Sequence, residues 1–145
     1  MILFLDSSAI VKLYADEEGS AIVRAGVQRA AQVVCHVIAY VEIRAALARK
    51  HRLGDIDEKA LAVLKREFGR DWPRFERVAV TEALVHRAAE LAETHAMTGF
   101  DSVHLAAAEM LSIAIGANVE FRFAVFDRRL RKAATAMGLH VLTAA

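Results

Sequence analysis

The chain opens with the stretch MILFLDSSA at residues 1–9, which joins a short apolar run to one acid and two hydroxyl residues. The run at 2–5 is too short for a helix and has no polar face, so we predict a strand buried on both sides. The three polar residues that follow, at 6–8, all favour a helix start, and we expect a helix over 9–15. A buried strand followed by an acid and then by a helix is typical of an open α/β sheet.

The same alternation of short apolar runs and helical stretches continues along the chain. We predict further strands at 33–37, 74–80, 121–126 and 139–142, and helices at 21–31, 39–51, 57–68, 81–96, from 98 onward, and 127–137. No linker or repeat interrupts this pattern, so we expect a single domain over residues 1–145. The predicted fold class is α/β, a three-layer α/β/α sandwich with a central, mostly parallel sheet. In such sheets ligands bind beyond the carboxyl ends of the strands.

Composition excludes several classes of protein. Of the 145 residues, 56% are hydrophobic, which disfavours disorder, and the net charge of +1 provides no global basic field for polyanions. The single cysteine, Cys35, excludes a disulfide framework and a zinc site built on several thiolates. The N-terminus lacks the basic region of a signal peptide, and no apolar run is long enough to cross a membrane. We therefore expect a soluble, cytoplasmic protein without membrane contact.

Four acids stand out by their positions. Asp6 and Asp127 follow predicted strands, Asp101 begins an almost wholly apolar helix, and Glu42 lies in a stripe of small apolar residues. Each has an ordinary structural interpretation: the three aspartates are favourable helix caps, and Glu42 could reach water from the edge of its stripe. Their joint pattern is instead typical of a carboxylate cluster.

Such a cluster has a definite chemistry. Several carboxylates within a few ångströms cannot all stay ionised without help, and a hard divalent cation removes the conflict. Mg²⁺ or Mn²⁺ prefers oxygen ligands and binds through a few carboxylates together with substrate phosphates. The pattern therefore favours Mg²⁺- or Mn²⁺-dependent hydrolysis of a phosphodiester.

Five segments together resemble the PIN-domain family, and more narrowly the VapC-type toxin ribonucleases of toxin–antitoxin pairs. They are LFLDSSA at 3–9, the helix and turn from VKLY at 11–14 to EGS at 18–20, VEI at 41–43, FDSVHLA at 100–106, and FDRRL at 126–130 followed by GL at 138–139. The resemblance spans nearly the whole chain. It implies an Mg²⁺- or Mn²⁺-dependent endoribonuclease with RNA as substrate, a cognate antitoxin protein as partner, and a homodimer.

The resemblance also assigns roles to residues. Asp6, Glu42 and Asp101 become the metal ligands, directly or through water, and Asp127 becomes either a carboxylate just outside this ligand set or a ligand of a second metal ion. Two supporting residues, Ser7 and His104, would hydrogen-bond the site, although Ser7 could be a helix cap and His104 a core histidine bound to a backbone group. Three arginines after Asp127 could hold RNA phosphates or form a solvated helix face; they are Arg128, Arg129 and Arg131.

Other functions remain open at this point. A non-catalytic PIN-like scaffold that binds RNA or protein would keep the fold without cleaving. A phosphotransfer receiver would need acids beside the first strand and a functional lysine late in the chain, and neither is evident. A phosphatase with a nucleophilic aspartate would need a second acid two residues after Asp6, where Ser8 stands. Loss of acids would favour the scaffold, and none is missing.

Overall fold

The computed structural model describes residues 1–143, which form a four-stranded, fully parallel sheet in the order β3-β2-β1-β4. The strands are β1 (Ile2–Leu5), β2 (Gln32–His36), β3 (Glu76–Val78) and β4 (Phe121–Ala124). β1 lies in the centre and pairs with β2 on one side and β4 on the other. The carboxyl ends of β1 and β4 lie side by side because Leu5 is in register with Ala124.

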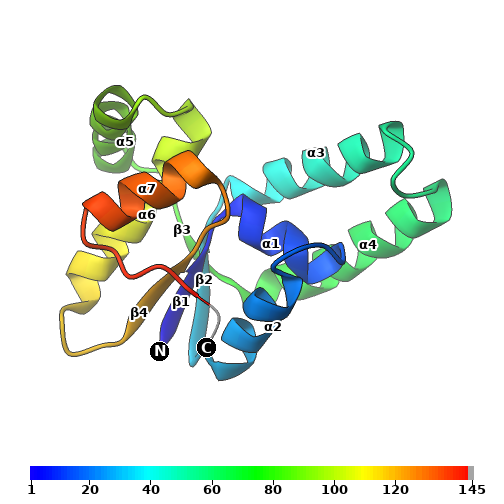
Figure 1. Cartoon of the computed structure of the whole chain (residues 1–145), viewed down its shortest axis with the longest axis horizontal. Coiled ribbons are helices and arrows are strands. Elements are labelled where there is room, and N and C mark those ends of the chain that lie inside the picture. Colours follow the sequence, from blue (N-terminus) through cyan, green and yellow to red (C-terminus); the bar gives the residue numbers. More distant parts are fainter. Residues whose placement is uncertain (144–145) are drawn as a thin grey trace.

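Helices connect each strand to the next, as parallel pairing requires. They are α1 (Ser7–Tyr14), α2 (Ser20–Arg29), α3 (Ala39–Arg52), α4 (Glu58–Asp71), the short 3₁₀ turn η1 (Trp72–Arg74), α5 (Glu82–His95), α6 (Gly99–Ile115) and α7 (Arg128–Ala136). In Figure 1, α3 and α4 extend away from the sheet as a long hairpin, while α5, α6 and α7 lie together on the opposite side. No helix in residues 1–143 is long and apolar enough to cross a membrane.

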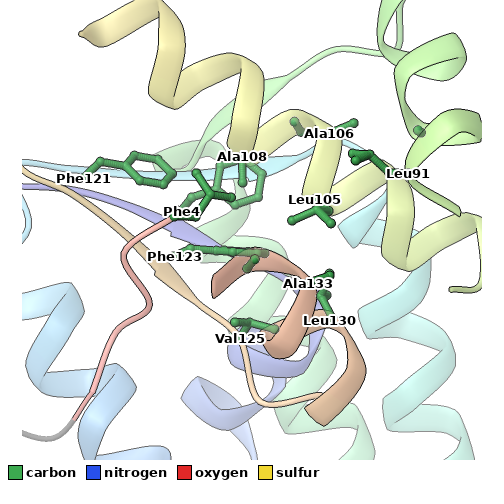
Figure 2. Close-up of a cluster of buried hydrophobic side chains, with 14 of the residues drawn as sticks. Phe4, Leu91, Leu105, Ala106, Ala108, Phe121, Phe123, Val125, Leu130 and Ala133 are labelled. Atoms are coloured by element: carbon green, nitrogen blue, oxygen red, sulfur yellow. The ribbon is translucent and has the colours of Figure 1, made fainter. Parts of the chain in front are cut away.

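Two separate hydrophobic cores cover the two faces of the sheet. Side chains alternate along β1, so Phe4 enters the core formed with α5, α6 and α7, whereas Leu3 and Leu5 enter the core formed with α1 to α4. Figure 2 shows the first core, in which Phe4 and Phe123 meet edge to face with ring centroids 5.6 Å apart. This arrangement confirms the predicted three-layer α/β/α sandwich.

Several predicted elements differ from the structure at their limits. The strand predicted at 74–80 is only Glu76–Val78, because residues 72–74 form the 3₁₀ turn η1. The strand predicted at 139–142 is reduced to a single parallel bridge between Phe123 and Val141. Gly138, at φ +78°, ends the preceding turn, and the chain then passes β4 with only a pair of backbone hydrogen bonds to Phe123. The first helix begins at Ser7 rather than at residue 9, because the Asp6 side chain accepts a hydrogen bond from the backbone of Ala9 and caps it there.

Candidate active site

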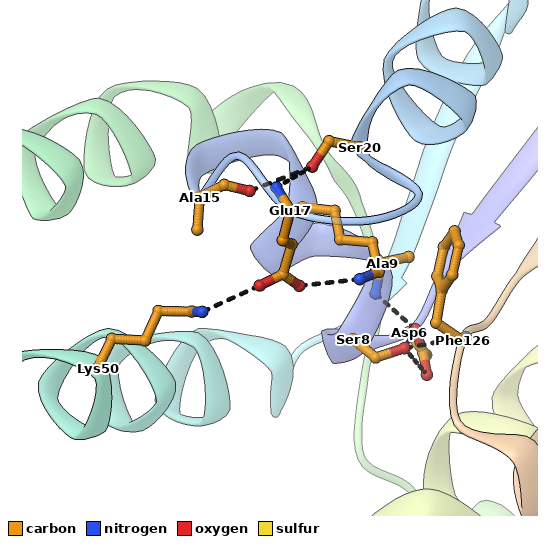
Figure 3. Close-up of polar contacts among 9 residues, drawn as sticks. Asp6, Ser8, Ala9, Ala15, Glu17, Ser20, Lys50 and Phe126 are labelled. Carbon is orange, nitrogen blue, oxygen red and sulfur yellow. Dashed lines mark hydrogen bonds and ion pairs between the residues drawn. The ribbon is translucent and has the colours of Figure 1, made fainter. Parts of the chain in front are cut away.

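Asp6 lies at the carboxyl end of β1 and is almost fully buried, with 3% of its surface exposed. Its carboxylate accepts hydrogen bonds from the Ala9 amide at 2.8 Å and from the Ser8 hydroxyl at 2.7 and 2.8 Å to its two oxygens. The Ser8 oxygen also accepts from the backbone amide of Phe126 at 3.1 Å (Figure 3). Ser8, one of the three residues expected to favour a helix start, therefore also joins Asp6 to the segment that leads from β4 to α7.

Burial controls the electrostatics of Asp6. Loss of solvent raises the pKa of its carboxyl group to about 6, against the opposing effects of His104, Ser8 and the Ala9 amide. The charge of Asp101 raises this pKa further, so the two carboxylates are near enough to repel each other. The structure thus brings together two of the predicted acids at the carboxyl edge of the sheet, where a cation would relieve both the burial and the repulsion.

Glu42, Ser7 and His104 form a hydrogen-bonded group beside Asp6. The Ser7 hydroxyl donates to Oε1 of Glu42 at 3.0 Å, and Nε2 of His104 lies 2.6 Å from the same oxygen and 3.1 Å from Oγ of Ser7. The side chain of His104 is 1% exposed and that of Glu42 is 20% exposed. His104 is therefore a core histidine, but its partners are side chains of the site and not the backbone group that the structural interpretation expected.

Asp101 and Asp127 line a surface hollow of about 860 Å³ between the turn that joins α5 to α6 and the start of α7. Asp127 is exposed and caps α7 by accepting from the Leu130 amide at 2.8 Å. Asp101 is not a cap, because Thr98 fills that position and accepts from the Asp101 amide at 3.3 Å. The hollow begins at the acids and continues along the basic face of α7.

The three predicted arginines occupy different positions. Arg128 lines the hollow together with Lys132. Arg129 also lines it, but its Nη1 donates to the carbonyl of Ala96 at 2.9 Å, which ties α7 to the end of α5. Arg131 lies outside this hollow and lines a neighbouring depression on α7 together with Arg128 and Lys132. Arg128 is thus the one arginine of the three that lines the hollow with the acids and whose side chain forms no hydrogen bond or ion pair with the described residues.

The oxygen-rich donor set suits a hard cation such as Mg²⁺ better than zinc, because it offers carboxylates and hydroxyl groups and the only cysteine is buried in the sheet. Within residues 1–143, no three Asp, Glu, His or Cys side chains converge closely enough to form a ready cation cage. The main argument for a cation at this site is the Asp6 carboxyl. It is buried beside Asp101, so a positive charge would stabilise its ionised form. Water and substrate oxygens commonly complete such sites for Mg²⁺.

An ion-pair network in which only Lys12 is buried lies at the far end of α1 (Figure 3). Glu17 binds Nζ of Lys12 at 2.8 Å and Nζ of Lys50 at 2.9 Å, and Lys12 lies over the Phe126 ring at 4.7 Å from its centroid. Gly19 also packs on that ring, where a Cβ atom would lie 2.4 Å from the nearest carbon. The sequence pattern identified none of these contacts, since each joins residues whose pairing depends on the folded path of the turn.

Comparison with known proteins agrees with the fold. The family model described as PIN domain matches residues 3–136. Two curated relatives are each 36% identical over 143 residues, covering 99% of this chain and 96% of theirs. They are Ribonuclease VapC45 and Ribonuclease VapC49, from two strains of Mycobacterium tuberculosis, CDC 1551 / Oshkosh and ATCC 25618 / H37Rv.

Solved structures show the same architecture at lower identity. FitAcB from Neisseria gonorrhoeae superposes with a TM-score of 0.69 at 21% identity, covering 99% of this chain and 97% of that one. VapBC2 from Rickettsia felis, bound to a DNA fragment from their promoter, superposes with a TM-score of 0.62 at 13% identity, covering 97% of both chains. These structural similarities establish the fold. The family match and the identity to the curated relatives establish the family. The chain therefore belongs to the PIN-domain family, in the group of the VapC-type ribonucleases.

Proposed function

We propose that this protein is a divalent-metal-dependent endoribonuclease that hydrolyses RNA phosphodiester bonds and acts as the toxin of a toxin–antitoxin pair. The observation that carries the proposal is the state of Asp6, a buried carboxyl with its pKa raised to about 6 at the carboxyl edge of a parallel sheet. Asp101 adds a second negative charge to the same place. Carboxyl groups with such perturbed pKa values are concentrated at functional sites. The oxygen donors of this site fit the binding of a divalent cation.

Asp6 and Asp101 would hold an Mg²⁺ or Mn²⁺ ion, with Glu42 as the third carboxylate. When bound, the ion lowers the pKa of a water molecule and neutralises charge on the phosphate undergoing attack. Asp127 lines the same hollow as Asp101 and directly precedes the basic residues of α7. We assign it to the RNA path beside the centre, where it also caps α7.

The remaining residues orient these acids. The Ser8 hydroxyl group contacts both carboxylate oxygens of Asp6. Ser7 and His104 both bind Oε1 of Glu42, so Oε2 of that carboxylate takes no part in these hydrogen bonds. Arg128 and Lys132 supply positive charge along the hollow and would hold the RNA backbone through its phosphates. These contacts position RNA without reading its bases.

A cognate antitoxin protein is the partner that we propose, on the basis of the similarity to the VapC ribonucleases and the likeness to the VapBC2 structure. We also propose that the chain forms a homodimer, as expected from the family resemblance. The second candidate function is a PIN-like scaffold that binds RNA or protein without cleaving it. The presence of all four acids, two of them electrostatically coupled, favours the enzyme.

The direct test is RNA cleavage by the purified, antitoxin-free protein. Deproteinised cellular RNA is incubated with Mg²⁺, with Mn²⁺ or with EDTA, using the native chain and Asp101→Asn. The proposal predicts discrete fragments that require metal and that disappear in the variant. Cleavage that survives both EDTA and Asp101→Asn would contradict it, and RNA binding without any cleavage would support the scaffold.

A further inference from the structure

A second histidine, His36, lies behind His104 and takes no part in the site described so far. It is the last residue of β2 and is fully buried. Its Nδ1 accepts a hydrogen bond from the Ile38 amide at 3.1 Å, so the neutral ring carries its proton on Nε2. That Nε2–H group is buried and has no hydrogen-bond partner among the described residues. The Ala79 carbonyl faces the ring closely enough for a weak hydrogen-bond-like contact that favours the protonated ring, but the contact does not reach full hydrogen-bond geometry.

His104 also has one buried nitrogen without a hydrogen-bond partner among the described residues. Its Nε2 lies 2.6 Å from a carboxylate oxygen of Glu42, and because a carboxylate only accepts, Nε2 must carry the proton. The other nitrogen, Nδ1, is then an acceptor in the neutral ring, and it too is buried without a partner. A buried donor on His36 and a buried acceptor on His104 therefore lie on neighbouring rings, each costing free energy while unpaired.

The spacing of the rings indicates how the two groups are satisfied. Their centroids are 6.2 Å apart and their planes are nearly perpendicular, at 84°. This separation exceeds two ring radii plus a hydrogen-bond length, so a direct N–H···N bond does not form. We propose that one buried water accepts from Nε2 of His36, donates to Nδ1 of His104 and makes His36 a positioning residue for Glu42. The Ala79 carbonyl provides a third partner, the usual number for a buried water.

This relay has a consequence for the site. By donating to Nδ1, the water reinforces the tautomer that Glu42 requires, with the proton on Nε2, and that proton in turn holds Oε1 of Glu42 in place. Residues that orient a metal-binding carboxylate through a hydrogen bond commonly change activity by about ten- to a hundredfold when replaced. His36 therefore acts on Glu42 across two intermediates. The activity part of this inference rests on the proposed function, whereas the hydrogen-bond part does not.

The first test measures the tautomers in the metal-free protein. Histidine labelled with nitrogen-15 is observed by long-range proton–nitrogen correlation, which distinguishes protonation at Nδ1 from protonation at Nε2. The native protein is expected to show the Nε2–H tautomer for both His36 and His104. In His36→Met the Nδ1 resonance of His104 should shift, because the water is no longer held to donate to that nitrogen, while the exposed-site control His86→Gln should leave it unchanged. A His104 spectrum that is the same in His36→Met as in the native protein overturns the relay.

The second test separates positioning from simple folding. His36→Gln keeps an N–H donor near the position of Nε2, whereas His36→Met removes it at similar volume. For RNA cleavage, His36→Met should lower kcat by about tenfold with little change in KM, and His36→Gln should restore most of the loss. Equal losses in both variants, in parallel with equal losses in thermal stability, would show a structural role only and overturn the proposal.

The third test does not depend on a variant that folds. A high-resolution crystal structure of the native protein should show one ordered water within hydrogen-bond distance of both Nε2 of His36 and Nδ1 of His104. A dry contact between the rings would overturn the relay even if the protein cleaves RNA. Conversely, the water and the tautomers remain measurable if RNA cleavage is never observed, so failure of the relay and failure of the proposed nuclease are distinguishable.

Discussion

Nε2 of His104 lies 2.6 Å from Oε1 of Glu42, although the two residues are 62 positions apart in the chain. His104 belongs to α6, on one face of the sheet, and Glu42 belongs to α3, whose buried residues pack on the other face. Ser7, in the first turn of α1, contacts both side chains between them. The site is therefore built where the two helical layers meet at the carboxyl edge of the sheet, and its geometry depends on the packing of both cores.

Gly19 offers a test of how the turn after α1 supports the site. Gly19→Ala introduces a Cβ atom 2.4 Å from the Phe126 ring at a φ of +88°, so the ring must move and the backbone is strained. We expect a loss of about 1–3 kcal/mol in the free energy of unfolding, together with slower RNA cleavage because Phe126 directly precedes Asp127. Urea denaturation and a cleavage assay measure the two effects.

The matched control is Gly54→Ala, which has a similar φ of +80° but nothing within 4 Å of the new Cβ atom. It should cost only the backbone term, about 1 kcal/mol, and leave cleavage unchanged. If both variants behave alike, the contact between Gly19 and Phe126 does not support the site.

Much of the fold could be predicted because the deciding signals are local. The apolar run of β1 followed by Asp6 marks a buried strand end, and parallel strands bring their carboxyl ends to one edge. The two interpretations of Asp6, helix cap and site acid, also prove compatible, since its carboxylate caps α1 while lying beside Asp101. The 139–142 segment could not be assigned correctly, because its three apolar residues do not reveal how little of the segment pairs with β4.

The parts that the sequence could not predict depend on partners distant in the chain. Ser8 accepts from the amide of Phe126, 118 positions away, and Ser7 lies beside His104, 97 positions away. No periodicity or spacing encodes such pairs, since they arise only after the sheet forms. The sequence also could not show that Arg128 lines the hollow and Arg131 does not, because both are on α7 and the face that meets the acids depends on how that helix packs.

The ion pairs of Glu17 predict a specific dependence of stability on pH. Burial alone would raise the pKa of Glu17, but its hydrogen bonds and charge interactions with Lys12 and Lys50 outweigh burial and lower the pKa below its ordinary 4.5. A carboxyl with a lowered pKa in the folded state stabilises the protein above its unfolded pKa, and this stabilisation is lost as the pH falls through the folded value. At pH 7, Glu17→Gln should therefore lower the free energy of unfolding by about 1 kcal/mol.

The measurement is denaturation of the native protein and Glu17→Gln from pH 7 to pH 2. The difference in stability should persist down to pH 4.5 and then shrink. Glu18→Gln serves as the control, because Glu18 is exposed and forms no ion pair within the described residues. A difference that stays constant at acid pH would mean that Glu17 acts through packing and not through its charge.

Arg128 should contribute to RNA binding through charge. Its loss in Arg128→Ala should weaken binding of single-stranded RNA and reduce the slope of log affinity against log salt concentration by about 0.7, as expected for one phosphate contact. Fluorescence anisotropy with EDTA present measures binding without turnover. Arg24→Ala is the control, because Arg24 pairs with Asp16 on an exposed surface of the α1–α2 turn. An unchanged slope in Arg128→Ala would exclude it from the RNA path.

The most direct test of the central claim compares two aspartates that do the same structural work. Asp6 caps α1 through the Ala9 amide at 2.8 Å, and Asp57 caps α4 through the Ala60 amide at 2.7 Å. Asparagine is also a good helix cap, so neither Asp6→Asn nor Asp57→Asn should break its helix. The measurement is the Mg²⁺-dependent rate of RNA cleavage by the native protein and both variants. We predict that Asp6→Asn slows cleavage by about a hundredfold or more while Asp57→Asn cleaves at the native rate. A native rate in Asp6→Asn would contradict the assignment of this site as the metal-dependent nuclease centre.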